Sequence, residues 1–218
     1  MPKPKKKQKK SPVKPVFKIY CEGEKTEPYY LRGYINEYHS GRRTLFVIPK
    51  TNKNTPVQLV DEAIDEKQKG NTGDIYWVVF DRESTTKYSH KLHTEARRKA
   101  KKNGIEIALS NVCFEFWLLL HFEKTTAAYN SYDDLIRKSN LKKYLKERGI
   151  ENYDKALTIL YNEVSKENGV QNAIINAEQV NKQISEAAQQ GEEEPHFLNP
   201  YTDVYKLLSS MREFSKSN

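Results

Sequence analysis

The segment from Asp74 to Asp81 (DIYWVVFD) is the feature of this sequence that most restricts its fold. Six consecutive large apolar residues, rich in β-branched and aromatic types, stand between two acids. A run of this kind is typical of a strand whose two faces are both buried, as in a parallel sheet. Such a sheet needs helices on both of its faces, so the rest of the chain has to supply them.

Segments with strand and helix patterns alternate on either side of this run. Pro56 opens one of the helical segments, and Gly70 and Gly104 follow the ends of two of them. This alternation predicts an α/β fold with a mostly parallel sheet flanked by helices. We expect strands over residues 16–21, 44–49, 74–81 and 105–109, and helices over residues 26–39, 56–69 and 90–103.

The pattern changes after Asn111. Residues 114–122 are almost wholly apolar and predict a buried helix, and the remaining segments have helical rather than alternating periodicity. We expect helices near residues 131–147, 152–167, 170–189 and 201–214, with a loop over residues 189–195. The expected organisation is a disordered basic arm over residues 1–15, an α/β catalytic core over residues 16–123 and an α-helical C-terminal region over residues 124–218.

The N-terminal arm carries much of the positive charge of the chain. The formal net charge is +8, and the first 18 residues hold eight lysines and no acid. The other 29 Lys and Arg residues equal the 29 Asp and Glu residues, so the body of the protein is close to neutral. The arm is suited to phosphate contacts with nucleic acid and equally suited to a role in solubility.

The sequence also restricts the compartment and excludes several classes of site. It contains no apolar run as long as a membrane span and no signal-peptide pattern. Cys21 and Cys113 lack metal-ligand spacing, which predicts buried thiols, and His90 and His93 lack an evident third zinc ligand. We therefore expect a soluble cytoplasmic protein with no membrane partner.

Acids occur at the carboxyl ends of three expected strands. Glu22 follows the first strand, Asp81 and Glu83 the third, and Glu115 the fourth. The carboxyl ends of parallel strands share one edge of a sheet, where α/β proteins bind ligands. Carboxylates gathered there repel one another unless a cation lies between them, and such oxygen ligands favour Mg²⁺ or Mn²⁺. The four acids form a candidate catalytic site for phosphodiester cleavage, with Glu22, Asp81 and Glu83 as metal ligands.

Three neighbouring residues are candidates for binding the substrate. Lys25 stands near the start of the first expected helix, Arg82 between two acids, and Asn111 after the fourth strand. A cation can contact a phosphate there, and an amide can orient water or a carboxylate. Simpler roles stay open at all of these positions, because acids and Asn often cap helices and a loop lysine is often only solvated.

Three blocks of the sequence resemble the RloB-like family. They are IYCEGEKTEPYY at residues 19–30, VFDRE at residues 79–83 and SNVCFEFWLLLHF at residues 110–122, with a weaker block, NPYTD, at residues 199–203. Together these blocks span nearly the whole chain after the arm. The family is associated with restriction and abortive-infection loci and is regarded as Toprim-like.

The resemblance implies a Toprim-like, Mg-dependent nuclease that acts on DNA or RNA, including tRNA, in prokaryotic antiviral defence. The Toprim pattern has a glutamate after the first strand and an Asp-x-Asp pair after the third. By this pattern Glu22 is the general acid or base, and Asp81 and Glu83 are metal ligands. Glu83 stands where a second Asp is usual, which leaves the metal geometry open.

The resemblance also implies partners. Nucleic acid is the expected substrate, a co-encoded ATPase or restriction-modification component is an expected regulator, and a homo-oligomer is compatible with both. A second class of function stays open, namely a non-catalytic module that binds nucleic acid or an effector. The crowded acids favour the nuclease, because a protein that only binds phosphates gains little from carboxylates that repel them.

Overall fold

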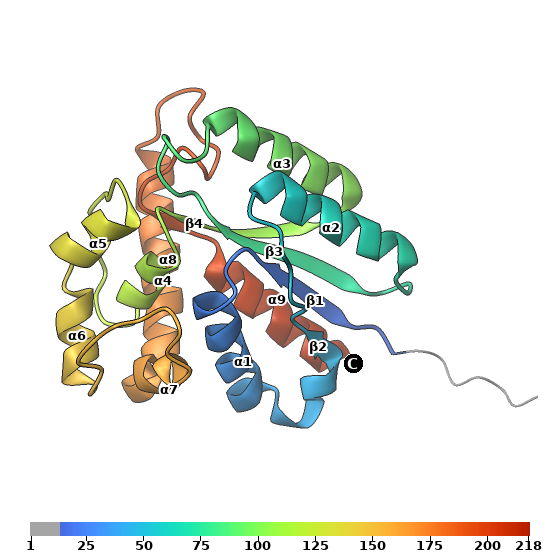
Figure 1. Cartoon of the computed structure of the whole chain (residues 1–218), viewed down its shortest axis with the longest axis horizontal. Helices are drawn as coiled ribbons and strands as arrows, with labels where there is room; N and C mark the ends of the chain where they lie inside the picture. The colour runs from blue at the N-terminus through green and yellow to red at the C-terminus, as the bar shows by residue number, and fades with distance from the viewer. Residues whose placement is uncertain (1–13) are drawn as a thin grey trace, which may run out of the picture.

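A computed structural model describes residues 14–218, so most of the expected arm over residues 1–15 lies outside the described residues. The described chain contains a five-stranded sheet in the order β2-β1-β3-β4-β5, with helices on both faces and a helical group at one end (Figure 1). The strands are β1 (Phe17–Cys21), β2 (Phe46–Val47), β3 (Ile75–Asp81), β4 (Glu106–Asn111) and β5 (Tyr201–Thr202). The first four are parallel, which confirms the predicted α/β fold with its mostly parallel sheet.

The apolar run that dominates the sequence is the central strand β3. It pairs in parallel with β1 on one side and with β4 on the other. Its side chains alternate between two cores, because Trp77 and Val79 pack on one face of the sheet and Val78 and Phe80 on the other. Both faces are buried, and this explains why the run has no polar residue inside it.

Two pairs of helices cover the two faces of the sheet. The helices α2 (Pro56–Lys69) and α3 (His90–Asn103) lie on one face, and α1 (Thr26–Tyr38) and α9 (Val204–Ser217) lie on the other (Figure 1). The bounds of α2 and α3 match the prediction because their sequences carry strong end signals. The Thr55 hydroxyl accepts a hydrogen bond from the backbone of Gln58 at the start of α2, and Gly104 ends α3 with a φ of 61°.

The C-terminal helical region stands beside one end of the sheet (Figure 1). Two of the long helices expected from periodicity are shorter than predicted. The segment 131–147 is divided after Lys138 by an extended residue, Ser139, and the segment 152–167 is helical only from Leu160. Apart from the helices that cover the sheet, the described chain contains α4 (Glu115–Leu119), α5 (Tyr132–Lys138), α6 (Leu141–Glu147), α7 (Leu160–Val164) and α8 (Gly169–Glu186). Short 3-10 turns are η1 (Ser40–Leu45), between α1 and β2, and η2 (Lys166–Asn168), before α8.

The end of the chain returns to the sheet, which helical periodicity did not predict. Tyr201 and Thr202 form β5, antiparallel to β4, before α9 begins. The Thr202 hydroxyl is 2.9 Å from the Ser110 hydroxyl, and the Asn181 amide of α8 donates to the Thr202 carbonyl at 2.8 Å. Both contacts are long-range, and the one from Asn181 satisfies a backbone carbonyl of a two-residue strand that local sequence alone does not specify.

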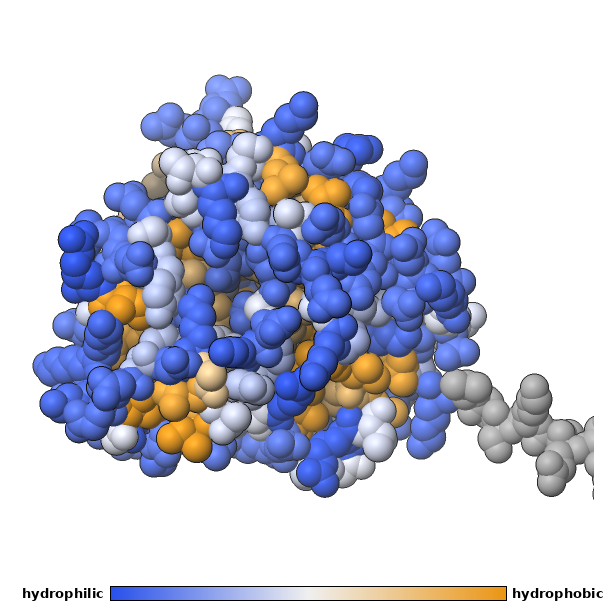
Figure 2. All heavy atoms as spheres, in the orientation of Figure 1, coloured by the Kyte–Doolittle hydropathy of each residue, from blue (hydrophilic) through white to orange (hydrophobic). Residues whose placement is uncertain are grey.

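The visible surface is mainly hydrophilic, with apolar side chains in small separate groups (Figure 2). Large apolar residues with substantial exposure lie in different segments, for example Ile159 in the turn before α7 and Ile175 in α8. Within residues 14–218, every helix is too short or too polar to cross a membrane.

Candidate functional site

The structure brings Glu22 and Asp81 together at the carboxyl ends of β1 and β3. The Glu22 backbone N–H donates to the carbonyl of Val79 at 2.9 Å, which continues the pairing of the two strands. The Asp81 backbone N–H donates to Glu22 Oε2 at 3.3 Å, and the Tyr88 hydroxyl donates to Glu22 Oε1 at 2.9 Å. The Glu22 carboxylate is therefore held beside Asp81, as the strand positions predict.

Glu115 lies at the start of α4 and is almost completely buried. Its side chain is only 1% exposed, and its Oε1 accepts a hydrogen bond from the Tyr153 hydroxyl at 2.8 Å. Its Oε2 is buried and has no hydrogen-bond partner among the described residues. A carboxylate oxygen in this state is costly to the fold, so a cation is the natural partner for it.

Glu27 joins the carboxylates, although the sequence reasoning did not single it out. It lies in the first turn of α1 and is 7% exposed. Gly23 makes room for it, because a Cβ at position 23 would lie 2.2 Å from Glu27 Oε2. The signal available in the sequence was the spacing of Gly23 and Glu27, since a glycine in the turn permits a buried side chain to lie directly against the backbone.

Burial and mutual repulsion raise the pKa values of three of these acids. Burial is the largest cause for Asp81, and the carboxylates of Glu27, Glu115 and Glu22 raise its pKa further. The pKa of Glu27 is raised by burial and then by Glu115, and that of Glu22 by burial, although the Tyr88 hydroxyl opposes the rise. The site therefore holds more negative charge than its surroundings stabilise.

Lys155 is a cation close to these buried carboxylates, and it comes from the C-terminal half of the chain. Its Nζ is 3.8 Å from Glu115 Oε1, and its backbone carbonyl accepts a hydrogen bond from the Thr26 hydroxyl at 3.2 Å. Burial lowers the pKa of Lys155, but Glu115 and Asp81 raise it overall. No local motif marks this residue, because only the fold brings it to the strand ends.

Glu22, Glu27 and Asp81 border an open pocket of about 460 Å³, whereas Glu115 is not part of its lining. Glu83 lies at this pocket with a positive φ of 58°, and its carboxylate pairs with Lys87 at 2.6 Å. Lys25, which the sequence suggested as a phosphate contact, lines the same pocket and is exposed. The full lining is Glu22, Gly23, Glu24, Lys25, Thr26, Glu27, Asn54, Asp81, Glu83, Lys87, Tyr88 and Lys155.

Arg82 and Asn111 do not join this group. Arg82 is 2% exposed, and its guanidinium donates to the backbone carbonyls of His196 and Tyr88, each at 2.9 Å. The Asn111 amide donates to the carbonyl of Leu198 at 2.6 Å. Neither side chain lines the pocket, because alternation along the strands directs it away from Asp81.

The donor chemistry of the site fits a hard divalent cation, whereas a complete ligand set is absent. Within the described residues, no three His, Cys, Asp or Glu side chains form a group arranged to hold a metal, and this includes His90 and His93. Mg²⁺ usually keeps several waters and uses one or two carboxylates together with substrate phosphates. Asp81, which lines the pocket, and the unpartnered oxygen of Glu115 are suited to that mode of binding.

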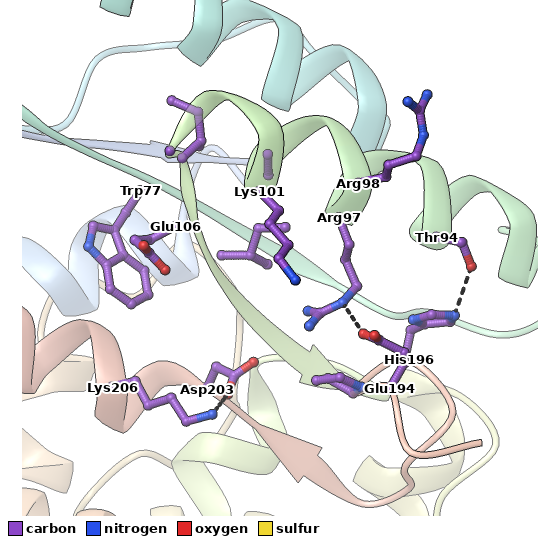
Figure 3. A pocket seen from close by; sticks show the side chains of 15 residues that line it. Trp77, Thr94, Arg97, Arg98, Lys101, Glu106, Glu194, His196, Asp203 and Lys206 are labelled. Atoms are coloured by element: carbon purple, nitrogen blue, oxygen red, sulfur yellow. Dashed lines mark hydrogen bonds and ion pairs between the residues drawn. The ribbon is translucent and has the colours of Figure 1, made fainter. Parts of the chain in front are cut away.

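A larger pocket of about 620 Å³ lies between α3, β4 and α9 (Figure 3). Its acids are largely neutralised, because Arg97 pairs with Glu194 and Lys206 with Asp203, each at 2.7 Å. It contains none of the carboxylates at the ends of β1 and β3. The smaller pocket is therefore the candidate active site.

Comparison with known proteins gives one family match. A family model described as RloB-like protein matches residues 17–211, which covers most of the chain and all three blocks of the resemblance. No curated protein and no solved structure matches the chain.

Proposed function

The chain belongs to the RloB-like protein family, and we propose that it is a Toprim-like, metal-dependent nuclease that cleaves phosphodiester bonds of DNA or RNA. The observation that supports this function is the buried group of carboxylates at the ends of the parallel strands, with its raised pKa values. A protein that only binds nucleic acid gains nothing from such a group, because carboxylates repel phosphates.

The residues of the site have two different roles, which are to hold the cation and to accept a proton. Asp81 and Glu83 would hold the cation, after Glu83 turns from Lys87, and Glu115 would add its unpartnered oxygen. A bound Mg²⁺ supplies an acidic water and neutralises charge that develops on the phosphate. Glu22 is held by the Tyr88 hydroxyl and the Asp81 amide, which both donate to its carboxylate, and burial raises its pKa, so this carboxylate is a stronger base than that of an exposed glutamate. Glu22 is therefore suited to accept the proton from the attacking water.

The biological setting of this activity is also a proposal. Membership of the RloB-like family and the lysine-rich N-terminal sequence support a nucleic-acid substrate and a role in prokaryotic antiviral defence. We propose that a co-encoded ATPase or restriction-modification component controls the nuclease. Control is needed because a free nuclease of broad specificity would damage the nucleic acids of its own cell.

The alternative is a non-catalytic module that binds nucleic acid or an effector. One observation favours it, namely that no three acidic or histidine side chains within residues 14–218 form a metal-binding group. The two functions differ in one measurable property, which is cleavage of the substrate. Only the nuclease cleaves it, and it does so only when a divalent cation is present.

The deciding experiment incubates the purified protein with supercoiled plasmid, single-stranded DNA and total tRNA. Each substrate is tested with Mg²⁺, with Mn²⁺ and with EDTA, both alone and with any co-encoded partner protein added. The nuclease predicts metal-dependent cleavage of at least one substrate. Binding without cleavage under every condition would favour the module instead.

Variants of the site test whether the carboxylates act as one unit. Glu22→Ala, Asp81→Ala and Glu83→Ala should each reduce cleavage nearly as much as the triple variant, because a site that lacks one group loses its geometry. Glu115→Gln should be milder, because the glutamine keeps a carbonyl oxygen that can still face the cation. The matched control is Glu178→Ala, which removes an exposed carboxylate from α8. Folded Asp81→Ala with wild-type activity would refute the proposed site.

A further inference from the structure

We infer that Lys155 is a substrate-binding residue, which contacts the phosphate that lies at the carboxylate site. The inference rests on the proposed function for the identity of the substrate, which is nucleic acid. It also assigns a role to the C-terminal region, because Lys155 belongs to the segment before α7 and not to the sheet or its covering helices.

The fold holds this segment firmly against the site. The Thr26 hydroxyl, at the start of α1, donates to the Lys155 carbonyl at 3.2 Å. Two residues earlier, the Tyr153 hydroxyl donates to Glu115 Oε1 at 2.8 Å. Contacts at both positions fix the backbone of Lys155 beside the carboxylates, so its side chain enters the pocket from a defined point.

Within the described part of the chain, the ammonium group of Lys155 makes only a long ion pair, with Glu115. Its distance of 3.8 Å from Glu115 Oε1 is longer than a direct hydrogen bond, and that oxygen already accepts the Tyr153 hydroxyl. The ammonium lies 4.4 Å from the centre of the Tyr132 ring, which restricts the side chain while leaving its N–H donors free. The side chain is 48% exposed, so a ligand in the pocket can reach it.

The other lysines of the pocket are placed differently. Lys87 forms a direct ion pair with Glu83 at 2.6 Å, and Lys25 is exposed near the start of α1. Lys155 stands beside the buried acids, where an entering phosphate meets the strongest repulsion. A cation at this point both attracts the phosphate and neutralises part of that repulsion.

A purely structural role for Lys155 makes a different prediction. If the lysine only balances the charge of Glu115 and Asp81, its removal should lower the melting temperature and leave phosphate contacts unchanged. If it binds substrate, its removal should reduce the number of counterions released on binding, whatever its effect on stability.

The experiment measures binding of a fluorescein-labelled single-stranded DNA and of labelled tRNA by anisotropy. Ca²⁺ replaces Mg²⁺ so that binding is followed without turnover, and the KCl concentration is varied. Lys155→Ala should bind about tenfold more weakly, with a salt slope reduced by about one. Lys155→Arg should retain most of the affinity. The control Lys182→Ala removes a lysine on α8 that is 77% exposed and should change neither value.

A second variant, in which the positive charge is restored chemically, tests the inference if Lys155→Ala is unstable. In Lys155→Cys, alkylation with bromoethylamine rebuilds an ammonium group at nearly the same position, and the native thiols of Cys21 and Cys113 are buried. The binding role predicts that alkylation restores the affinity and the salt slope. The inference would be overturned by a folded Lys155→Ala protein that binds as tightly as Lys182→Ala. It would also be overturned if alkylated Lys155→Cys still bound the probes weakly, or if wild type bound neither probe.

Cleavage in Mg²⁺, measured on the same preparations, keeps this result separate from the nuclease proposal. A wild type that binds through Lys155 but never cleaves would leave the inference standing and the nuclease refuted. Cleavage by wild type with no change of binding in Lys155→Ala would refute the inference and support the nuclease.

Discussion

The Tyr88 hydroxyl donates a hydrogen bond of 2.9 Å to Glu22 Oε1, although the two residues are separated by 66 positions in the sequence. The same hydroxyl also contacts the carbonyl of Asn54. Tyr88 lies in the loop after β3, so this contact ties that loop to the end of β1 and fixes the direction of the Glu22 carboxylate.

Tyr88→Phe should therefore impair catalysis more than folding. Loss of the hydroxyl frees the Glu22 carboxylate, and removal of an orienting partner of a site residue commonly reduces activity by about 10 to 100-fold. A hydrogen bond to a charged group contributes about 1.5–3 kcal/mol to stability, which a folded domain of this size can lose without unfolding. Cleavage rates together with melting temperatures test this expectation. A large fall in melting temperature without loss of activity would assign Tyr88 to the fold alone.

Asp81→Asn should stabilise the metal-free protein, and the gain should increase with pH. The folded state raises the pKa of Asp81 above its ordinary value of 3.8, so the wild type loses stability as the pH rises past that value. Asparagine carries no charge and avoids this loss. A pKa difference of one corresponds to about 1.4 kcal/mol, and about 1 kcal/mol changes the melting temperature of a chain this size by about 2–4 °C.

Thermal unfolding of both proteins from about pH 5 to about pH 8, with EDTA present, measures this effect. Burial lowers the pKa values of His93, His121 and His196, which opposes the trend at acidic pH but acts equally on both proteins. The difference between the two proteins isolates Asp81. An equal difference at every pH would show that repulsion at Asp81 costs the fold little.

Divalent cations should bind the wild type and raise its melting temperature near neutral pH. The reason is that a cation offsets the repulsion among Asp81, Glu27 and Glu115. Titration calorimetry with Mg²⁺ and Mn²⁺ should give heats of binding that weaken sharply in Asp81→Ala and persist in Glu178→Ala. Identical binding by all three proteins would place the cation elsewhere.

Gly33→Ala should destabilise the contact between α1 and the C-terminal region. A Cβ at position 33 would lie 2.4 Å from the ring of Tyr161, which belongs to α7 and is itself buried. Overpacking of this kind typically costs about 1–3 kcal/mol. Gly41→Ala is the control, since a Cβ there meets nothing within 4 Å. Chemical denaturation should separate the two variants, and equal stability would mean that Tyr161 moves freely.

Deletion of residues 2–15 should weaken nucleic-acid binding without abolishing cleavage. The deleted segment contains seven lysines and none of the candidate site residues. Fewer counterions are then released on binding, so the dependence of affinity on salt should become less steep. Anisotropy at several KCl concentrations measures the slope. A slope equal to that of the full chain would exclude the arm from substrate binding.

The sequence by itself determined the α/β core and the position of its candidate site. The run from Asp74 to Asp81 specifies a central strand because six apolar residues need burial on both faces. The bounds of α2 and α3 follow from the cap residues Thr55, Ser89 and Gly104, whose effects are local. Glu22 and Asp81 meet because parallel strands place their carboxyl ends at one edge, and this needs only the order of the strands.

The tertiary structure alone decided which other side chains surround that edge. Glu27 enters because Gly23 leaves space for it, and Lys155 enters through a segment anchored more than a hundred residues away in the sequence, at Thr26. Arg82 is directed away from the site, and its guanidinium bonds to the backbone carbonyls of His196 and Tyr88. Cap and strand signals act between neighbours in the chain, whereas burial, charge neutralisation and long-range hydrogen bonds depend on which distant segments pack together.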